Sequence, residues 1–281
     1  MRRFTLSCVL TGLTMVPADA HDPQPLTSTY VTTAPVIDGD LAEWETMPFI
    51  EVTPQNGVFD GESGGTERPE DFSFSFSVTN DSQYLYVAVR IVDDVLVLDT
   101  NPDPTELHTR AWMDDAVEIF IDGNHNHASN ARDSAGVEFK TGGEFSVVAN
   151  GAVTSDQSGV PGRGNDPEAW TSAGSYGADG PAYSAPWDTA TGGFQIEARL
   201  NFKIMGADVG PGSRIGFTVS AHDDDNGGNR DVALYWKGVS RSSWRDEGGW
   251  GDLILGVLAT AISPTSLGEV KSTLDSSGGR P

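Results

Sequence analysis

The feature that most constrains the fold is a hydrophobic alternation of period two. In residues 71–94, DFSFSFSVTNDSQYLYVAVRIVDD, aromatic or aliphatic residues alternate with other residues on both sides of Asn80-Asp81-Ser82. Such alternation places one set of side chains on a single face of a strand, and Asn, Asp and Ser are typical turn residues. The segment therefore predicts a β-hairpin.

The same alternation recurs along the chain, and the sequence from 28 to 257 has no convincing helical stripe. Further strands are predicted at residues 116–121, 144–149, 194–200, 214–221, 232–236 and 252–257. Many short strands separated by Gly, Asp and Asn turns indicate an all-β fold, a β-sandwich of antiparallel strands of jelly-roll or immunoglobulin-like type. Residues 150–192 are rich in Gly, Ser, Asp and Pro, so a long loop is expected there.

The first twenty residues have the three parts of a secretory signal. Arg2 and Arg3 are followed by the apolar stretch FTLSCVLTGLTMV and by small residues at the candidate cleavage site. The apolar stretch is too short to span a bilayer. We therefore expect a mature chain that begins near His21 and is secreted, either periplasmic or extracellular. Cys8 is the only cysteine, and its loss with the signal predicts a mature protein without disulfides.

The charge balance excludes some classes of partner. The chain has 17 basic and 41 acidic side chains, which gives a formal net charge of -24. Such a surface repels polyanions, so neither nucleic acid nor an anionic membrane surface is expected as a partner. A solvated acidic surface on a monomer explains this charge, and divalent cations are the functional alternative.

The stretch RAWMDDAVEIFIDG, residues 110–123, carries a tryptophan and carboxylates beside a strand pattern. If residues 116–121 form a strand, the branched aliphatic residues face the core and Glu118 lies on the opposite face. Trp112 has the same parity as Glu118. An outward aromatic ring near an outward carboxylate is suited to binding a sugar, because the ring stacks on C–H groups and the oxygens accept hydroxyl protons.

Two other interpretations of this stretch remain. Hydrolysis of a glycoside needs two carboxyl groups roughly 5 to 10 Å apart. Asp114, Glu118 and Asp122 are each four residues apart, which is roughly 13 Å in a strand, so a second carboxylate would have to come from another strand. In a purely structural interpretation, Trp112 is buried and Glu118 is only solvated.

The segment HDDDNGGNRD, residues 222–231, holds four carboxylates around two glycines. Calcium takes six to eight hard oxygen ligands, and this segment can supply several of them. The pattern is not that of an EF-hand, and an acidic turn between two strands would look the same. The histidines show no spacing typical of a zinc site.

Four segments occur in an order and spacing that resemble a known family. They are APVIDGDLAEW (34–44), NDSQYLYVAVRIVDD (80–94), WMDDAVEIFID (112–122) and SWRDEGGWGDLIL (243–255). Together they resemble the family 9 carbohydrate-binding modules, which are β-sandwiches attached to secreted xylanases and related enzymes. The resemblance covers residues 28–257 and leaves 258–281 as a linker or tail.

The resemblance implies particular site residues. The family's sugar slot lies between two tryptophans, which correspond to Trp112 and Trp244, and its carboxylate corresponds to Glu118. Another strand of the family also supplies polar side chains to the sugar. The corresponding segment here, GGEFSVVANG, offers Glu144 and Ser146.

The resemblance also implies a structural calcium ion. In the acidic segment the candidate ligands are Asp223, Asp225 and Asp231, and the secondary candidates are Asp93 and Asp115.

The predicted function is non-catalytic carbohydrate binding by an exported module associated with polysaccharide degradation. The expected partner is an oligosaccharide or the end of a polysaccharide chain. The alternatives are a glycoside hydrolase acting on O-glycosyl bonds, a haem-binding relative with an axial Met or His, and a surface or assembly protein that kept the sandwich without the slot.

Overall fold

The computed structural model describes residues 22, 24–59, 68–97, 111–127, 141–149, 153–156, 168, 170–176, 193–227, 229–239 and 243–259. The predicted signal (1–20) and almost all of the predicted tail (258–281) lie outside these residues. Among the described residues, no helix combines the length and the apolar character needed to cross a membrane.

The described part of the chain is built from strands and short 3-10 helices. The strands are β1 (Leu26–Thr27), β2 (Thr29–Tyr30), β3 (Ile50–Val52), β4 (Val58–Phe59), β5 (Phe72–Asn80), β6 (Tyr84–Asp93), β7 (Ala116–Asp122), β8 (Gly142–Val148), β9 (Val153–Asp156), β10 (Trp170–Tyr176), β11 (Phe194–Asn201), β12 (Arg214–Asp223), β13 (Val232–Tyr235) and β14 (Gly251–Ile254). The 3-10 helices are η1 (Ala42–Trp44), η2 (Ala111–Met113), η6 (Phe202–Ile204) and η7 (Glu247–Gly249).

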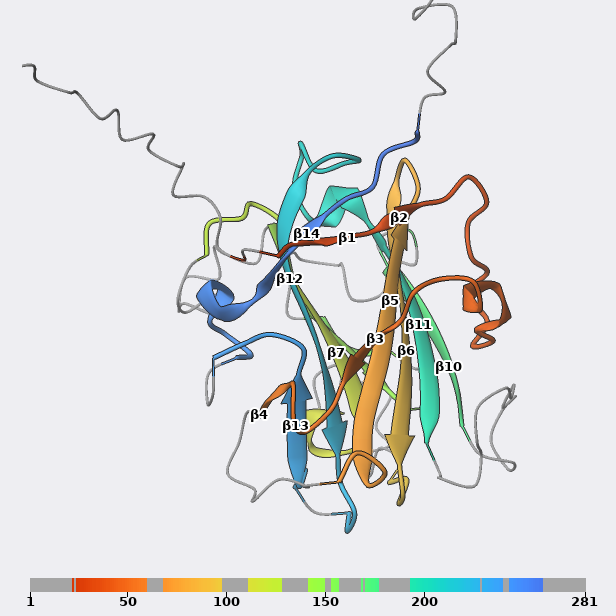
Figure 1. The fold of residues 1–281 in the computed structure, drawn as a ribbon, viewed down its shortest axis with the longest axis vertical. Helices are drawn as coiled ribbons and strands as arrows, with labels where there is room; N and C mark the ends of the chain where they lie inside the picture. The colour runs from red at the N-terminus through yellow and green to blue at the C-terminus, as the bar shows by residue number, and fades with distance from the viewer. Residues whose placement is uncertain are drawn as a thin grey trace, which may run out of the picture.

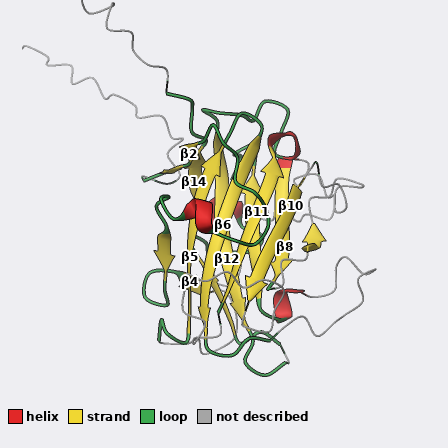
Figure 2. Ribbon diagram, turned by 90° about the vertical axis from the view of Figure 1, so that its right-hand side faces the viewer, coloured by secondary structure: helices red, strands yellow, loops and turns green. Residues whose placement is uncertain are grey.

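The strands form two sheets that pack face to face (Figure 1). Within the described residues the larger sheet has eight strands, in the order β1-β14-β12-β7-β8-β9, with β13 pairing β12 and β4. The smaller sheet has six, in the order β10-β11-β6-β5-β2, with β3 pairing β5. Figure 2 shows β6, β11 and β10 side by side along the long axis. The predicted β-sandwich is confirmed.

The core lies between the two sheets and follows the alternation of the sequence. In β5 and β6 the alternating apolar residues from Phe72 to Ile91 are buried in this core. In β7 the residues Val117, Ile119 and Ile121 face the same core, so Glu118 lies on the outer face, as parity predicted. The hairpin and all six further strands are present, with ends that differ by a few residues.

The prediction of one long loop at 150–192 is wrong in part. β9 and β10 lie within this range, and β10 pairs with β11 along its whole length. Trp170 is buried against Phe145, with 5.2 Å between ring centroids. The composition of this range favours loops. The pairing of β10 with β11 and the burial of the Trp170 ring outweigh that preference. Residues 157–167 and 177–192 of the predicted loop lie outside the described residues.

Among the described strands, two pairings are parallel. β1 pairs with β14, and β2 pairs with β5. A side-chain clamp joins these strands at one corner, where the Asn80 amide nitrogen donates to the Gly256 carbonyl at 3.0 Å and the Asn80 carbonyl oxygen accepts from the Gly256 N–H at 2.8 Å. The Ser28 N–H donates to the Ile254 carbonyl at 3.0 Å. The segments before β2 and after β14 are therefore held together.

The DGDLAEW segment is held on the outer face of the smaller sheet by one buried carboxylate. Glu197 of β11 accepts hydrogen bonds from the N–H groups of Asp38 (2.8 Å) and Gly39 (2.7 Å) and from the Trp44 indole (3.2 Å). Burial raises the pKa of Glu197 to about 7, against the lowering effect of these hydrogen bonds. Trp44 is fully buried, with Leu41 and Tyr86 as neighbours.

Glu197→Ala is expected to lower the free energy of unfolding by about 3 kcal/mol, because it leaves two buried donors and one partly buried donor without their acceptor. Urea denaturation of the variant and the parent measures this difference. Glu197→Gln keeps one acceptor oxygen and should lose less. Equal stability of Glu197→Ala and the parent would show that the segment is not held by this carboxylate.

Candidate functional site

The outer face of the larger sheet carries an aromatic cluster of its own. Phe120 packs against Tyr235 and Trp250, with ring centroids 5.7 and 5.4 Å apart. Trp244 packs on this cluster and is half-buried. Because Phe120 alternates with the core residues of β7, its ring projects from the opposite face and gives the segment after β13 an apolar base.

The segment that carries Trp244 is fixed to the sheet at two points. The Trp250 indole donates to the Ser243 carbonyl at 2.6 Å. The Thr218 hydroxyl of β12 donates to the Lys237 carbonyl at 2.8 Å. These bonds hold the residue before Trp244 and the start of the segment, so the tryptophan has a defined place above the sheet.

Trp112 lies in η2, which is separated from the start of β7 by two residues, and Trp112 is 40% exposed. Its backbone carbonyl accepts a hydrogen bond from His222 Nδ1 at 3.1 Å, since a carbonyl can only accept. The Arg230 guanidinium lies 5.1 Å from the centre of the indole ring, within the range of a cation–π contact. The ring is therefore oriented without being buried in the core.

Glu118 is 3% exposed and is held at both oxygens. The Ser146 hydroxyl donates to Oε1 at 3.2 Å, and His222 Nε2 lies 3.3 Å from Oε2. His222 thus connects the Glu118 carboxylate to the backbone that carries Trp112. The orientation of the carboxylate is therefore fixed. The purely structural interpretation expected a solvated Glu118 instead.

A cavity of about 330 Å³ opens between these elements. It is lined by Trp112, Glu118, Glu144, Arg230 and Trp244. Four of the five predicted binding residues therefore line one cavity, and the fifth, Ser146, contacts Glu118 from the neighbouring strand.

The sequence alone did not identify two residues of this site, His222 and Arg230. His222 stands outward on β12, two residues from Ser220, and parity alone could have placed it on this face. Arg230 follows a glycine-containing turn, and no sequence pattern places its side chain over Trp112.

The cavity holds two carboxylates from adjacent strands. Glu118 pairs with Ser146, and Phe120 pairs with Glu144, so Glu118 and Glu144 are diagonal neighbours across β7 and β8. Diagonal neighbours in an antiparallel pair are about 7 to 8 Å apart at their Cα atoms. The cross-strand carboxylate that sequence analysis left open is Glu144.

A second cluster, here called the acidic cluster, joins Asp93, Asp115 and Asp223 at the ends of β6 and β12 and before β7. All three are buried, and one oxygen of each lies within 4.8 Å of the others. Burial and the neighbouring carboxylates raise the pKa of Asp223 to about 8. Burial also raises the pKa values of Asp93 and Asp115.

The ligand atoms that the acidic cluster offers are of the kind that calcium binds. Its groups are hard carboxylate oxygens, and Asp93 Oδ2 is buried without a hydrogen-bond partner among the described residues. Asp225 forms a second group with Asp93 and Asp94, the last of which the sequence analysis did not single out.

Asp231 has a different place from the other candidates. Its Oδ2 accepts from the Asp225 N–H at 3.2 Å and from the Asn226 amide at 2.8 Å, and it joins neither group among the described residues. It shapes the turn between β12 and β13.

Comparison with known proteins gives a family match over most of the chain. Residues 37–257 match the model of the carbohydrate family 9 binding domain-like family. This range contains both tryptophans of the cavity and the whole acidic cluster.

Two curated relatives are similar over 79% of this chain. One is endo-1,4-beta-xylanase A of Thermotoga maritima, 28% identical over 223 residues, and the other is endo-1,4-beta-xylanase A of Thermotoga neapolitana, 27% identical over 222 residues. The aligned part of this chain covers 17% of each xylanase.

Two solved structures share the fold. Both are of a family 9 carbohydrate binding module from Caldicellulosiruptor kristjanssonii. The complex with cellotriose has a TM-score of 0.56 at 17% identity, covering 86% of this chain and 98% of the other. The complex with glucose has a TM-score of 0.57 at 18% identity, covering 86% and 100%.

Proposed function

Because the chain belongs to the carbohydrate family 9 binding domain-like family, we propose that the cavity between Trp112 and Trp244 is its sugar-binding site. The observation that carries this proposal is the composition of the cavity wall. Two indole rings and two carboxylates line the same space.

These side chains match the two kinds of surface on a sugar. An indole ring packs against the C–H face of a pyranose, and carboxylate oxygens accept hydrogen bonds from hydroxyl groups. Glu118 meets the sugar with its orientation already fixed by Ser146 and His222. Less side-chain freedom is then lost on binding.

The size of the cavity favours a short ligand. Its volume, about 330 Å³, is at the lower end of the roughly 300 to 1,000 Å³ typical of ligand pockets. We propose that it takes the end of a polysaccharide chain or a short oligosaccharide. A glycan array with the purified protein tests this, and binding to internal chain segments alone would contradict it.

We further propose an exported, non-catalytic module that acts beside polysaccharide-degrading enzymes. The signal-like residues 1–20 support export. The similarity to part of two xylanases supports the association with such enzymes.

Calcium is proposed as a structural ion at the acidic cluster. Asp93, Asp115 and Asp223 would hold it, and the ion would supply positive charge between three buried carboxylates. The ends of three chain segments would then be joined through one ion.

Glu118→Gln is expected to weaken sugar binding by about 1 to 3 kcal/mol, the range for a hydrogen bond to a charged group. The amide keeps the shape of the side chain but has one acceptor oxygen instead of two. Calorimetry with the best sugar from the array measures the affinity, and thermal melting of the same variant measures the fold. Loss of folding with unchanged affinity in the folded fraction would make Glu118 a structural residue.

Hydrolysis is the second candidate function, and the Glu118–Glu144 pair is the observation that favours it. The diagonal register of the pair is compatible with the roughly 6.5 to 9.5 Å between carboxyl groups in inverting glycosidases. Release of reducing sugar by the parent, lost in both Glu118→Gln and Glu144→Gln, would establish catalysis. Sugar binding without any release would leave the binding function alone.

A further inference from the structure

A third group of side chains lies on the outer face of the larger sheet, beyond the end of β7. Asp122 and Asp252 both pair with Gly216 of β12, from its two sides. A Cβ on Gly216 would lie 2.9 Å from the Asp122 Cβ, so the glycine keeps the space between the two aspartates clear. The turn after β7 brings two histidines to this space.

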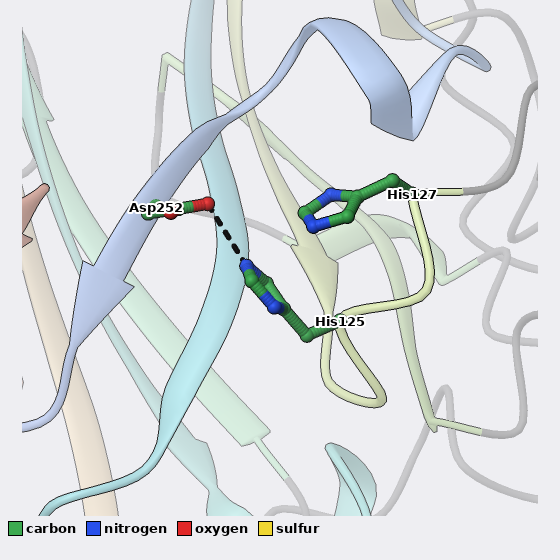
Figure 3. A group of neighbouring side chains, drawn as sticks. All are labelled: His125, His127 and Asp252. Carbon is green, nitrogen blue, oxygen red and sulfur yellow. Dashed lines mark hydrogen bonds and ion pairs between the residues drawn. The ribbon is translucent and has the colours of Figure 1, made fainter. Parts of the chain in front are cut away.

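His125 and His127 converge on Asp252 (Figure 3). His125 Nε2 lies 2.9 Å from Asp252 Oδ1, and the two imidazole rings have centroids 4.1 Å apart. One possible ligand atom of each residue lies within 4.8 Å of the others. The sequence showed no zinc spacing because the carboxylate comes from a strand 125 positions later than His127, and a spacing pattern cannot include it.

The backbone turns both rings toward the same side. His125 and His127 have φ angles of 51° and 56°, in the left-handed region. Such a conformation costs of order 1 to 3 kcal/mol for a residue other than glycine. The His127 N–H donates to Asp122 Oδ2 at 3.1 Å, which fixes the second of the two left-handed residues to the end of β7.

The carboxylate is also held in place. Asp252 is fully buried, and its Oδ2 accepts from Arg214 Nη1 at 2.9 Å and from the Asp22 N–H at 3.4 Å. These contacts occupy the outer oxygen and direct Oδ1 toward the imidazoles. A partner on the far oxygen of a carboxylate is the usual arrangement around a metal ligand.

We propose that His125, His127 and Asp252 bind a transition-metal dication of the zinc type. Two imidazole nitrogens and one carboxylate oxygen are ligands that suit Zn²⁺, Ni²⁺ or Cu²⁺, whereas calcium takes oxygen ligands. The His125 side chain is 17% exposed, so solvent can reach the group and supply a further ligand.

The His125–Asp252 distance requires only a small adjustment, and the other two distances between ligand atoms are at most 4.8 Å. Ligand atoms about 2.0 to 2.1 Å from a tetrahedral zinc are about 3.3 Å from one another. The His125–Asp252 contact would open by a few tenths of an ångström from its hydrogen-bonded 2.9 Å. The site is separate from the sugar cavity, because Asp122 is four residues along β7 from Glu118, about 13 Å.

Titration calorimetry with Zn²⁺ tests the proposal. The full mature chain, made without a polyhistidine tag, is kept in calcium so that the acidic cluster does not compete. Zinc should bind at one equivalent per chain and raise the melting temperature. His125→Asn and His127→Asn should each weaken zinc binding by at least about tenfold, and asparagine is chosen because it tolerates the left-handed conformation.

Asp208→Asn is the control, since it changes an exposed carboxylate that belongs to no candidate metal group among the described residues, and it should bind zinc like the parent. Imidazole ¹H–¹⁵N spectra of the parent give a readout that needs no variant to fold. Zinc should shift the ring nitrogens of His125 and His127 and leave those of His222 in place. Absence of zinc binding by the parent, unchanged affinity in both asparagine variants, or unshifted His125 and His127 nitrogens would each overturn the proposal.

Discussion

Trp112→Ala is expected to weaken sugar binding by at least about 2 kcal/mol, a rise of about 30-fold in the dissociation constant. The change removes one aromatic wall of a cavity that has two, and water then reaches the Glu118 carboxylate that lines the same cavity. The fold should survive, because the ring is 40% exposed and contributes little to the core. Calorimetry with the best sugar and thermal melting are measured on the same samples.

Two controls separate stacking from other effects. Trp112→Phe keeps an aromatic face of smaller area and should lose only part of the affinity. Val257→Ala removes a more exposed apolar side chain outside the cavity and should bind like the parent. An unchanged dissociation constant in Trp112→Ala would place the sugar elsewhere.

Calcium is expected to raise the melting temperature at pH 8 by about 5 to 10 °C. An ion that binds only the folded state at about 100 times its dissociation constant adds about 2.7 kcal/mol. One kcal/mol corresponds to about 2 to 4 °C in a domain of this size. Scanning calorimetry with calcium and with chelator gives the difference. Identical midpoints with calcium and with chelator would show that the acidic cluster does not bind a stabilising calcium ion.

The same cluster predicts how stability changes with pH in the metal-free protein. The pKa of Asp223 is raised to about 8 in the fold, above its ordinary value, and those of Asp93 and Asp115 are raised as well. A carboxyl with a raised pKa favours folding at low pH, and this contribution is lost as pH rises through the folded pKa. Stability should therefore fall as the pH rises from about 4 to about 8.

Calcium should oppose this fall, because it binds the deprotonated carboxylates. Its stabilising effect is thus expected to be small near pH 5 and large near pH 8. Asp223→Asn removes one of the three charges and should reduce both the pH dependence without metal and the effect of calcium. Chemical denaturation across this pH range, in chelator and in calcium, distinguishes the two effects. A calcium effect that is the same at pH 5 and pH 8 would contradict the assignment.

The sequence was informative where structure depends on near neighbours. Alternation in β7 separated the core residues from Glu118, because a strand has a period of two and no distant contact is needed to infer it. The same reasoning identified the hairpin of β5 and β6. In β10 the local signal failed, because Trp170 is buried through pairing with β11 and the composition around it favours a loop.

The parts that sequence could not supply are contacts between strands. Glu144 lies diagonal to Glu118 only because of the register between β7 and β8. The Trp112 carbonyl meets His222, 110 residues away, through the pairing of β7 with β12. Sheet order and register follow from the packing of the whole chain, so no single segment reveals them. The resemblance to a family supplied the tryptophan pair, which spacing alone did not.

The parallel pairing of β1 with β14 has a mechanical consequence. Parallel strands that are pulled at the start of one and the end of the other slide along each other, so tension loads their hydrogen bonds together rather than one at a time. The Asn80 clamp to Gly256 lies next to this pair and shares the load. Tethers attached before Leu26 and after Gly256 would therefore meet a shear-resistant corner. Resistance to force is governed by the unfolding rate, so a slow force-induced rupture is expected even where equilibrium stability is modest.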